Sequence, residues 1–278
     1  MEATFNMTQL TINFAHANGF PAASYRQLFE HLPEQIEVLA KPRYGHEPHF
    51  PVSRNWDNQI NEMAQFIEAN VAEPVIGVGH SFGALLTLLT SIARPDLFKG
   101  LILIEPPAFT GVKARTIQFL KMTRMINKVP LAKLARNRRN GWAIDEDIVA
   151  YFRGKALFKE FSDTAIADYV TAGMVQENDA YKLFFKPEVE ADIFLNVPHH
   201  LHKLRGKMTR PATLITAANG GVVNGSGIAR LCRYFDLSHH IFHQGGHLFP
   251  LEKPSATAKL IQDLLQPFLA DKEQKNAD

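Results

Sequence analysis

The sequence predicts an α/β fold in which a mostly parallel sheet carries helices on both faces. Short apolar runs typical of strands alternate along the chain with longer runs that have helical spacing. The strand-like runs are almost continuously apolar, as expected where both faces of a sheet are covered. With 278 residues, 46% of them hydrophobic and 21% charged, the chain is long enough to bury a large core.

Six strands are expected in chain order, and helical runs connect most of them. The strand candidates are LTINFAH (10–16), IEVLA (36–40), PVIGVG (74–79), GLILIE (100–105), ATLIT (212–216) and HHIFHQ (239–244). Helical spacing marks NWDNQINEMAQFIEAN (55–70), ALLTLLTSIARPDLF (84–98), SGIARLCRYF (226–235) and the closing SATAKLIQDLLQPFLA (255–270). Strands joined by helical crossovers run parallel, which gives the predicted sheet.

The alternation is interrupted from about Pro107 to about Lys207, where helical patterns continue without a strand-like run. We therefore expect a core of residues 1–107 and 208–278, and a helical insertion over residues 108–207. Its first part, KARTIQFLKMTRMINKVPLAKLARNRR (113–139), has many Lys and Arg and no acid. Such a segment suits a solvated helix face, an anionic substrate or a membrane surface. Its aromatic residues are expected partly in a local core and partly around an apolar pocket: Phe109, Phe119, Phe152, Phe158, Phe161, Phe184 and Phe185.

Composition gives little support to several other classes of protein. A net charge of +2 gives no reason to expect nucleic acid, and the single Cys232 cannot form an intrachain disulfide. The first twenty residues lack the basic start and apolar core of a signal peptide, and no apolar stretch is long enough for a membrane span. We expect a cytoplasmic protein without integral membrane association; the oligomeric state stays open.

Histidines are concentrated in HHLH (199–202) and HHIFHQGGH (239–247), which raises the question of a metal site. Strand alternation would turn His240 away from His239, and no acidic ligand lies alongside. We therefore expect no metal and no cofactor.

The segment PVIGVGHSFGALLTLL (74–89) carries the main chemical signal. A strand-like run leads into Gly79, His80, Ser81, Phe82 and Gly83, and a helical run begins at once. A GxSxG match alone is weak, but on a tight strand-to-helix turn the two glycines prevent clashes with the neighbouring strand and helix. The turn lifts the Ser81 hydroxyl clear of the sheet and aims a helix N-terminus at it. His80 is expected only to fill a variable position of the turn.

Three motifs in this order resemble the α/β-hydrolase superfamily over most of the chain. FAHANGFPAASY (14–25) is similar to its oxyanion loop, GHSFG (79–83) to its nucleophile elbow and GGHLFPLEKP (245–254) to the loop of its catalytic histidine. The resemblance implies the fold of that family, with the insertion as its cap domain. It also implies Ser81 as nucleophile and His247 as general base. The backbone N–H groups of Phe20 and Phe82 would be the oxyanion donors, with Asn18 as a secondary contributor. His16 would organise the oxyanion loop by hydrogen bonding.

The acid of this resemblance is missing from its usual place. Members of the family usually carry an Asp after the seventh strand, where TLITAANGGVV (213–223) has Gly220 or Gly221, and no Asp or Glu occurs from Phe194 to Phe235. Glu105 ends a strand at the carboxyl edge, where ligand sites of open α/β sheets form. Asp236 precedes the last strand and so belongs to the opposite edge. We favour Glu105 over Asp236 as the partner of His247.

These features predict a serine hydrolase of the carboxylesterase kind, acting on an ester or related acyl bond of a small apolar molecule. A serine hydroxyl needs a neutral imidazole to accept its proton, and two backbone donors stabilise the oxyanion. Three alternatives stay open: carbon–carbon bond hydrolysis by the same Ser81 and His247, a non-catalytic binding protein of this fold, and a metal-dependent enzyme.

Overall fold

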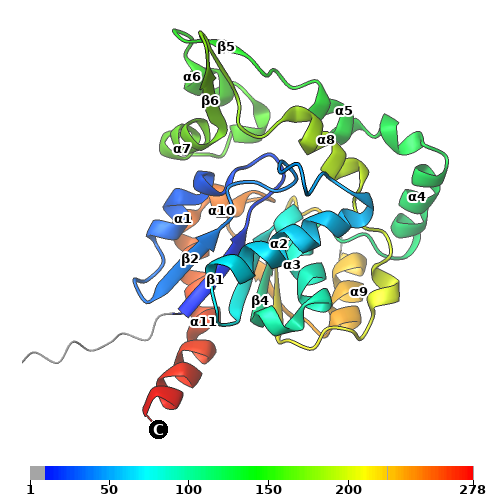
Figure 1. Cartoon of the computed structure of the whole chain (residues 1–278), viewed down its shortest axis with the longest axis vertical. Helices are drawn as coiled ribbons and strands as arrows, with labels where there is room; N and C mark the ends of the chain where they lie inside the picture. The colour runs from blue at the N-terminus through cyan, green and yellow to red at the C-terminus, as the bar shows by residue number, and fades with distance from the viewer. Residues whose placement is uncertain (1–9, 224, 278) are drawn as a thin grey trace, which may run out of the picture.

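A six-stranded sheet forms the centre of the molecule in the computed structural model, which describes residues 10–223 and 225–277. All of its strands run parallel, in the order β2-β1-β3-β4-β8-β9 (Figure 1). The strands are β1 (Leu10–Ala15), β2 (Ile36–Ala40), β3 (Val75–His80), β4 (Phe98–Ile104), β8 (Ala212–Ala217) and β9 (Ser238–Phe242). Each of the six predicted strands is present, and the predicted fold class is confirmed.

Helices cover both faces of this sheet, because both faces are apolar. In β4 successive side chains alternate between two buried clusters, Leu101 and Leu103 on one side and Ile102 and Ile104 on the other. The first face packs against α2 (Asp57–Asn70), α3 (Phe82–Ala93) and α9 (Gly225–Phe235). The second packs against α1 (Arg26–Glu30), α10 (Phe249–Glu252) and α11 (Pro254–Ala277).

Some predicted helix boundaries are wrong. The run ending at Phe98 is interrupted earlier: α3 stops at Ala93, Pro95 opens a short 3-10 turn, and Phe98 already belongs to β4. Proline disfavours the helical conformation of the residue before it, which accounts for the stop. At the other end, α11 continues to Ala277, beyond the predicted limit of 270. Short 3-10 turns also occur at η1 (Ala22–Tyr25), η2 (Arg54–Trp56) and η3 (Pro95–Leu97).

The segment between β4 and β8 is mainly helical, as predicted, but it also contains short strands that the sequence did not indicate. Its helices are α4 (Gly111–Met122), α5 (Pro130–Arg136), α6 (Ile148–Arg153), α7 (Asp163–Gly173) and α8 (Pro187–Leu195), with 3-10 turns η4 (Met125–Lys128), η5 (Ala156–Phe158) and η6 (Leu201–Leu204). A small antiparallel sheet joins them, in the order β5-β7-β6: β5 (Trp142–Ala143), β6 (Met174–Glu177) and β7 (Ala180–Leu183). A two-residue turn connects β6 to β7, and Asn178 there has a φ of +53°. Asn is one of the residues that tolerate this conformation in hairpin turns.

This segment lies across the sheet on the side opposite the end of α11 (Figure 1). Its aromatic residues mostly form a local core. Phe158, Phe161 and Tyr169 are buried and pack on Phe20, and the buried Phe152 packs on Tyr169. These buried side chains therefore stabilise the segment and do not line an open pocket.

In the described ranges, no helix has the length and apolar character that crossing a membrane requires.

Candidate active site

Ser81 occupies a sharp turn between β3 and α3. Its φ of +54° lies in a region that side chains rarely adopt, and its N–H donates to the Ile104 carbonyl at 2.8 Å. Its own carbonyl accepts from the amides of Ala84 and Leu85, which ties the turn to the first turn of α3. The strained backbone is held by these bonds, as at a nucleophile elbow.

The two glycines of the turn are required by close backbone contacts. A Cβ on Gly79 would lie 2.5 Å from the Gly83 carbonyl oxygen, and one on Gly83 would lie 2.1 Å from the Ala15 carbonyl oxygen. Neither backbone atom can move aside as a flexible side chain would. The prediction that side chains here would clash with the neighbouring strand and helix is confirmed.

Ser81, His247 and Glu105 lie in a line of hydrogen bonds, although 142 and 166 residues separate His247 from the other two. His247 Nε2 is 3.0 Å from Ser81 Oγ, and His247 Nδ1 is 3.1 Å from Glu105 Oε2. An ionised carboxylate can only accept, so Nδ1 carries the proton and Nε2 faces the hydroxyl as an acceptor. The side chain of His247 is 25% exposed and that of Glu105 only 1%, so the line runs from solvent into the core.

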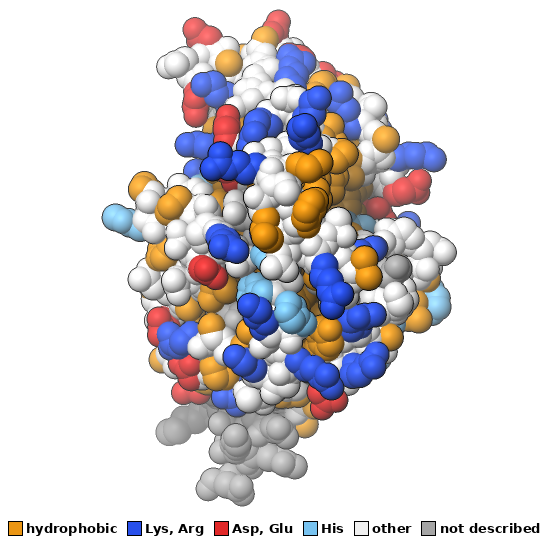
Figure 2. Space-filling model, turned by 90° about the vertical axis from the view of Figure 1, so that its right-hand side faces the viewer, with side chains coloured by type: hydrophobic (Ala, Val, Ile, Leu, Met, Phe, Trp, Pro, Cys, Tyr) orange, Lys and Arg blue, Asp and Glu red, His pale blue; other side chains and the backbone are white. Residues whose placement is uncertain are grey.

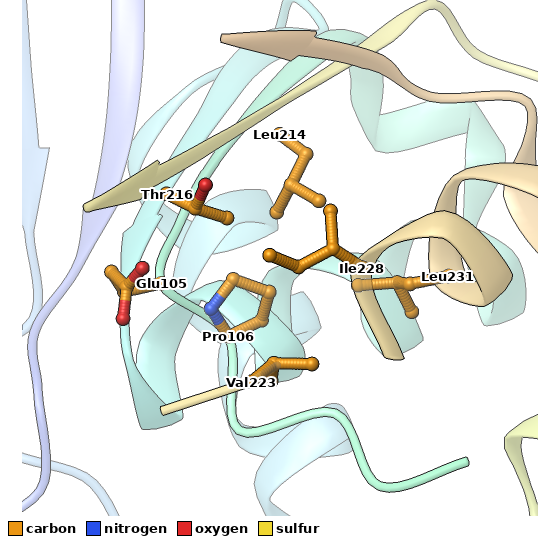
Figure 3. Close-up of a pocket in the computed structure, with 7 residues that line it drawn as sticks. All are labelled: Glu105, Pro106, Leu214, Thr216, Val223, Ile228 and Leu231. Atoms are coloured by element: carbon orange, nitrogen blue, oxygen red, sulfur yellow. The ribbon is translucent and has the colours of Figure 1, made fainter. Parts of the chain in front are cut away.

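Glu105 is held by the loop in which an acid was expected and not found. The amide of Ala217 donates to Glu105 Oε1 at 2.7 Å, and the amide of Val222 donates to Oε2 at 2.9 Å. Burial opposes ionisation of this carboxyl, but hydrogen bonds from His247 and from these two amides outweigh it and hold the pKa of Glu105 below its ordinary value. Beside it lies an apolar crevice that keeps water away, formed by Pro106, Leu214, Thr216, Val223, Ile228 and Leu231 (Figure 3).

Asp236, the other candidate, lies away from this line. It is exposed and precedes β9, at the amino edge of the sheet, whereas Ser81, Glu105 and His247 follow β3, β4 and β9. The glycine at the usual position of the acid faces the same spot as Glu105 does. A Cβ built on Gly221 would lie 3.0 Å from Glu105 Oε1. Glu105 therefore fills, from β4, the space that an acid after β8 would use.

Of the two predicted oxyanion donors, the Phe82 amide is free to bind an oxyanion, whereas the Phe20 amide already has an acceptor. Phe82 is the first residue of α3, so its amide has no acceptor within the helix and belongs to the positive end of the helix dipole. The amide of Phe20 already donates to the Ala17 carbonyl at 3.0 Å, closing a turn in which Gly19 has a φ of +79°. Because this bond occupies the Phe20 amide, the geometry argues against its predicted role. The amide of the half-buried Asn18 in the same turn makes none of the described backbone hydrogen bonds, which favours it instead.

Backbone and side-chain groups of the segment between β4 and β8 hold this turn. Asn18 Nδ2 donates to the Glu190 carbonyl at 2.9 Å, and the Glu190 carboxylate packs against Gly19 and pairs with Arg138. His16, expected to organise the loop, donates from Nδ1 to the Ala17 carbonyl at 2.8 Å. Burial lowers the pKa of His16 to about 4, so its ring stays neutral.

His80 connects three loops of the site, a role that its sequence position did not indicate. Burial first, and the nearby His247 second, lower the pKa of His80 to about 3, so the ring is neutral and has a single N–H. His80 Nε2 donates to the His247 carbonyl at 2.9 Å, which leaves Nδ1 to accept from the Tyr25 hydroxyl at 2.7 Å. The same hydroxyl accepts the Ala17 amide at 3.1 Å. A buried chain thus joins the turn at Ala17, the elbow and the His247 loop.

Replacing Tyr25 by phenylalanine is expected to loosen this chain. The Ala17 amide and His80 Nδ1 would both lose their partner in a dry interior, and the free energy of unfolding should fall by about 1–3 kcal/mol. Misplacing the His247 loop should also lower kcat by about tenfold while KM changes little. Urea unfolding and steady-state kinetics measure both effects. Tyr44→Phe is the matched control, since Tyr44 is equally buried and bonds none of these loops. Equal behaviour of the two variants would contradict the linking role.

A groove of about 740 Å³ lies along the loop after β8. Its lining comes from β8, this loop, α9 and β9 and includes Ala218, Gly221, Cys232 and His239. Ser81 and His247 are not part of that lining.

In the described part of the chain, no three His, Cys, Asp or Glu side chains are grouped as metal ligands.

Sequence comparison places these features in a known family. Residues 14–260 match the family described as the alpha/beta hydrolase family. A stretch of 144 residues is 28% identical to Lipase LipV of Mycobacterium tuberculosis and covers 47% of this chain, but it spans only 54% of that lipase. Over 253 residues the chain is 23% identical to a probable alcohol acetyltransferase of Saccharomyces cerevisiae, covering 87% of this chain and 71% of that protein.

Solved structures share the fold at low sequence identity. E-2-(acetamidomethylene)succinate hydrolase superposes with a TM-score of 0.68 at 19% identity, covering 93% of this chain and 91% of that one. The peroxisomal alpha-beta-hydrolase Lpx1 of Saccharomyces cerevisiae has a TM-score of 0.73 at 15% identity, covering 94% of this chain and 77% of that one. Because the family match spans residues 14–260 and these folds agree, the chain belongs to the alpha/beta hydrolase family.

Proposed function

We propose that this protein is a serine hydrolase that cleaves an ester or related acyl bond of a small apolar molecule. The observation that carries the proposal is the line of hydrogen bonds from Ser81 through His247 to Glu105, with contacts of 3.0 and 3.1 Å. A hydroxyl, an imidazole and a buried carboxylate in this order are the parts of a catalytic triad. Relatives named as a lipase and as a hydrolase agree with hydrolysis of an acyl bond.

The first half-reaction transfers the acyl group to Ser81. Its Oγ attacks the carbonyl carbon while His247 Nε2 takes the hydroxyl proton, and the carbonyl oxygen becomes an oxyanion. Glu105 holds Nδ1–H and stabilises the imidazolium that forms. Collapse of the tetrahedral intermediate breaks the bond to the leaving group, which takes the proton from Nε2. The product of this half-reaction is an acyl-Ser81 ester and a free alcohol or amine.

Water completes the cycle by the same steps. His247 Nε2 accepts a proton from a water molecule, whose oxygen attacks the acyl carbon. Collapse of the second intermediate breaks the bond between the acyl carbon and Ser81 Oγ, His247 Nε2 returns the proton to Oγ, and the carboxylic acid leaves. The amide of Phe82 and that of Asn18 are assigned to the oxyanion in both halves. One donor of this kind contributes about 3 kcal/mol to lowering the barrier.

Residues 108–207 are proposed to act as a cap over this site. Supporting contacts run from the segment to the turn that includes Asn18: Glu190 accepts from Asn18 Nδ2 through its carbonyl at 2.9 Å, and the Tyr169 hydroxyl donates to the Gly19 carbonyl at 3.4 Å. The specificity of the enzyme is assigned to this segment. Its buried aromatic cluster fixes the shape of the cap rather than binding substrate directly.

A non-catalytic binding protein is suggested only by the lack of an acid after β8. The Glu105 carboxylate, 3.1 Å from His247 Nδ1, supports a catalytic role instead. Carbon–carbon bond hydrolysis would use the same serine and histidine, and no contact in the site favours it over ester hydrolysis. The two reactions therefore have to be separated by substrate.

A panel of p-nitrophenyl esters with graded acyl length tests the proposal. We expect turnover that depends on acyl length, together with stoichiometric labelling of the chain by a fluorophosphonate probe. Vinylogous diketones run alongside report carbon–carbon cleavage. Turnover of diketones without ester turnover would replace the acyl-bond assignment. If the protein shows no turnover and no labelling, the non-catalytic binding protein is favoured and the proposal is overturned.

A further inference from the structure

Helices α4 and α5 and the turn η4 between them carry an unusual concentration of exposed apolar side chains. Nine large hydrophobic side chains are exposed in the described part of the chain, and six of them lie in this stretch: Val112, Phe119, Met122, Met125, Leu131 and Leu134. Figure 2 shows apolar side chains gathered on the face that α4 presents, with Lys and Arg around them. We call these six side chains, with the cations of residues 111–139, the α4–α5 surface.

Most large apolar side chains of α4 and α5 point outward, whereas those of a helix whose outer face meets only water point inward. In α5 the small Ala132 and Ala135 point inward, while Leu131 and Leu134 are 56% and 71% exposed. In α4 the buried residue is Ala114. Helices at a water boundary place their large apolar residues inward. Apart from the half-buried Ile117 and Leu120 of α4, the large apolar residues of these two helices point outward instead, and they present an apolar face that has no partner within the described chain.

The outward residues of α4 lie on a single stripe. Val112, Arg115, Phe119 and Met122 are spaced i, i+3, i+7 and i+10, which places them on one side of a helix. Lys121 points the other way and donates to the Val197 carbonyl at 2.7 Å. The stripe is thus fixed in orientation, with apolar tips and a guanidinium on the same side.

The charge of the same stretch has one sign. Residues 111–139 contain nine Lys and Arg and no Asp or Glu. Three of these cations pair with acids elsewhere: Arg136 with Asp192, Arg138 with Glu190 and Arg139 with Glu146. Among the side chains that the structure describes, no ion pair engages five others: Lys113, Arg115, Arg124, Lys128 and Lys133.

We propose that the α4–α5 surface docks on an anionic lipid bilayer. The apolar tips would enter the boundary between headgroups and acyl chains, and the five unpaired cations would lie at the level of the acidic headgroups. A second copy of the chain fits less well, because a twofold interface would bring the same cationic stretch against itself. A nucleic acid would engage the cations and leave the apolar tips in water.

Co-sedimentation with lipid vesicles tests this proposal on the full-length protein. We expect binding to vesicles of phosphatidylcholine mixed with phosphatidylglycerol, much weaker binding to phosphatidylcholine alone, and loss of binding at high salt. Lys113→Gln/Arg124→Gln/Lys128→Gln should weaken binding by about fivefold per cation, or about a hundredfold in total. Phe119→Ser/Leu134→Ser should weaken it by about tenfold, since two apolar tips are removed.

Matched controls lie outside the α4–α5 surface. Leu157→Ser removes an apolar side chain that is 58% exposed, and Lys159→Gln/Lys203→Gln/Lys207→Gln removes three exposed cations. Both controls should bind within about twofold of the parent chain if the site is local. Thermal unfolding checks that every variant is folded. Equal affinity for neutral vesicles, or equal losses in the controls, would overturn the proposal. Self-association in analytical ultracentrifugation without vesicle binding would assign the face to a second copy instead.

Discussion

Replacing Ser81 by alanine is expected to lower kcat by about 10⁵–10⁶-fold and to abolish labelling by a fluorophosphonate. The variant keeps the tight turn, since the hydroxyl makes no bond there except to His247 Nε2 at 3.0 Å. What it removes is the attacking atom, and no acyl intermediate can then form. Ester turnover and the intact mass of the labelled protein measure the two effects.

A serine in α3, the helix that follows the elbow, serves as the control for Ser81. Ser91 lies in α3, is buried and contacts Met208 Sδ at 3.6 Å, away from the elbow. Ser91→Ala should keep both labelling and turnover close to those of the parent chain. If Ser81→Ala still reacted with the probe at a single site, another residue would be the nucleophile and the mechanism given above would be wrong.

Replacing Glu105 by glutamine is expected to lower kcat by about 10³–10⁴-fold. The amide has almost the shape of the carboxylate but lacks its charge, so it cannot stabilise an imidazolium on His247. Its NH₂ group is also a hydrogen-bond donor at a place where the neighbouring groups are donors as well. In one orientation its NH₂ group faces the Ala217 amide, and in the other it faces the Val222 amide together with His247 Nδ1–H. KM should change much less than kcat, because Glu105 is buried beneath His247 and away from the substrate.

Asp236→Asn is the control for this prediction. Asp236 is exposed at the amino edge of the sheet, so kcat should stay within about twofold of that of the parent chain. Near-normal turnover of Glu105→Gln, or a large loss in Asp236→Asn, would reject Glu105 as the acid. Circular dichroism on both variants separates lost catalysis from lost folding.

Much of the core fold was predictable because its patterns are local. A parallel sheet covered on both faces needs strands that are mostly apolar, and β1, β3 and β4 are such strands, buried along almost all of their length. The elbow was predictable because its GxSxG pattern is local, although only Gly79 has its close contact within the turn, whereas Gly83 lies against Ala15 of β1. The position of Glu105 followed from β4 ending at the carboxyl edge of the sheet.

Other features depend on contacts that no local pattern records. The hairpin of β6 and β7 has strands of only four residues, too short for their alternation to stand out among the neighbouring helices. The motif around Phe20 does not reveal that its amide closes a turn onto the Ala17 carbonyl. The bonds of His80 reach Tyr25 and His247, 55 and 167 residues away, so its role became visible only in the fold.

The central claim is that His247 works with a carboxylate supplied from β4 in place of one after β8. Position 221 allows the carboxylate to be returned experimentally to the loop after β8. A side chain there is free of the strain that affects Gly220, with its φ of +69°, and its Cβ would lie 3.0 and 3.2 Å from the two carboxylate oxygens of Glu105. With Glu105 truncated, an aspartate at Gly221 would place its carboxylate close to the same point, within reach of His247 Nδ1.

The most direct test is therefore the kcat of Glu105→Ala compared with that of Glu105→Ala/Gly221→Asp. We predict a severe loss in the single variant and a recovery of at least about tenfold in the double variant, because a carboxylate again orients His247. Turnover of folded Glu105→Ala at the level of the parent chain, or equal turnover of the two folded variants, would contradict the claim.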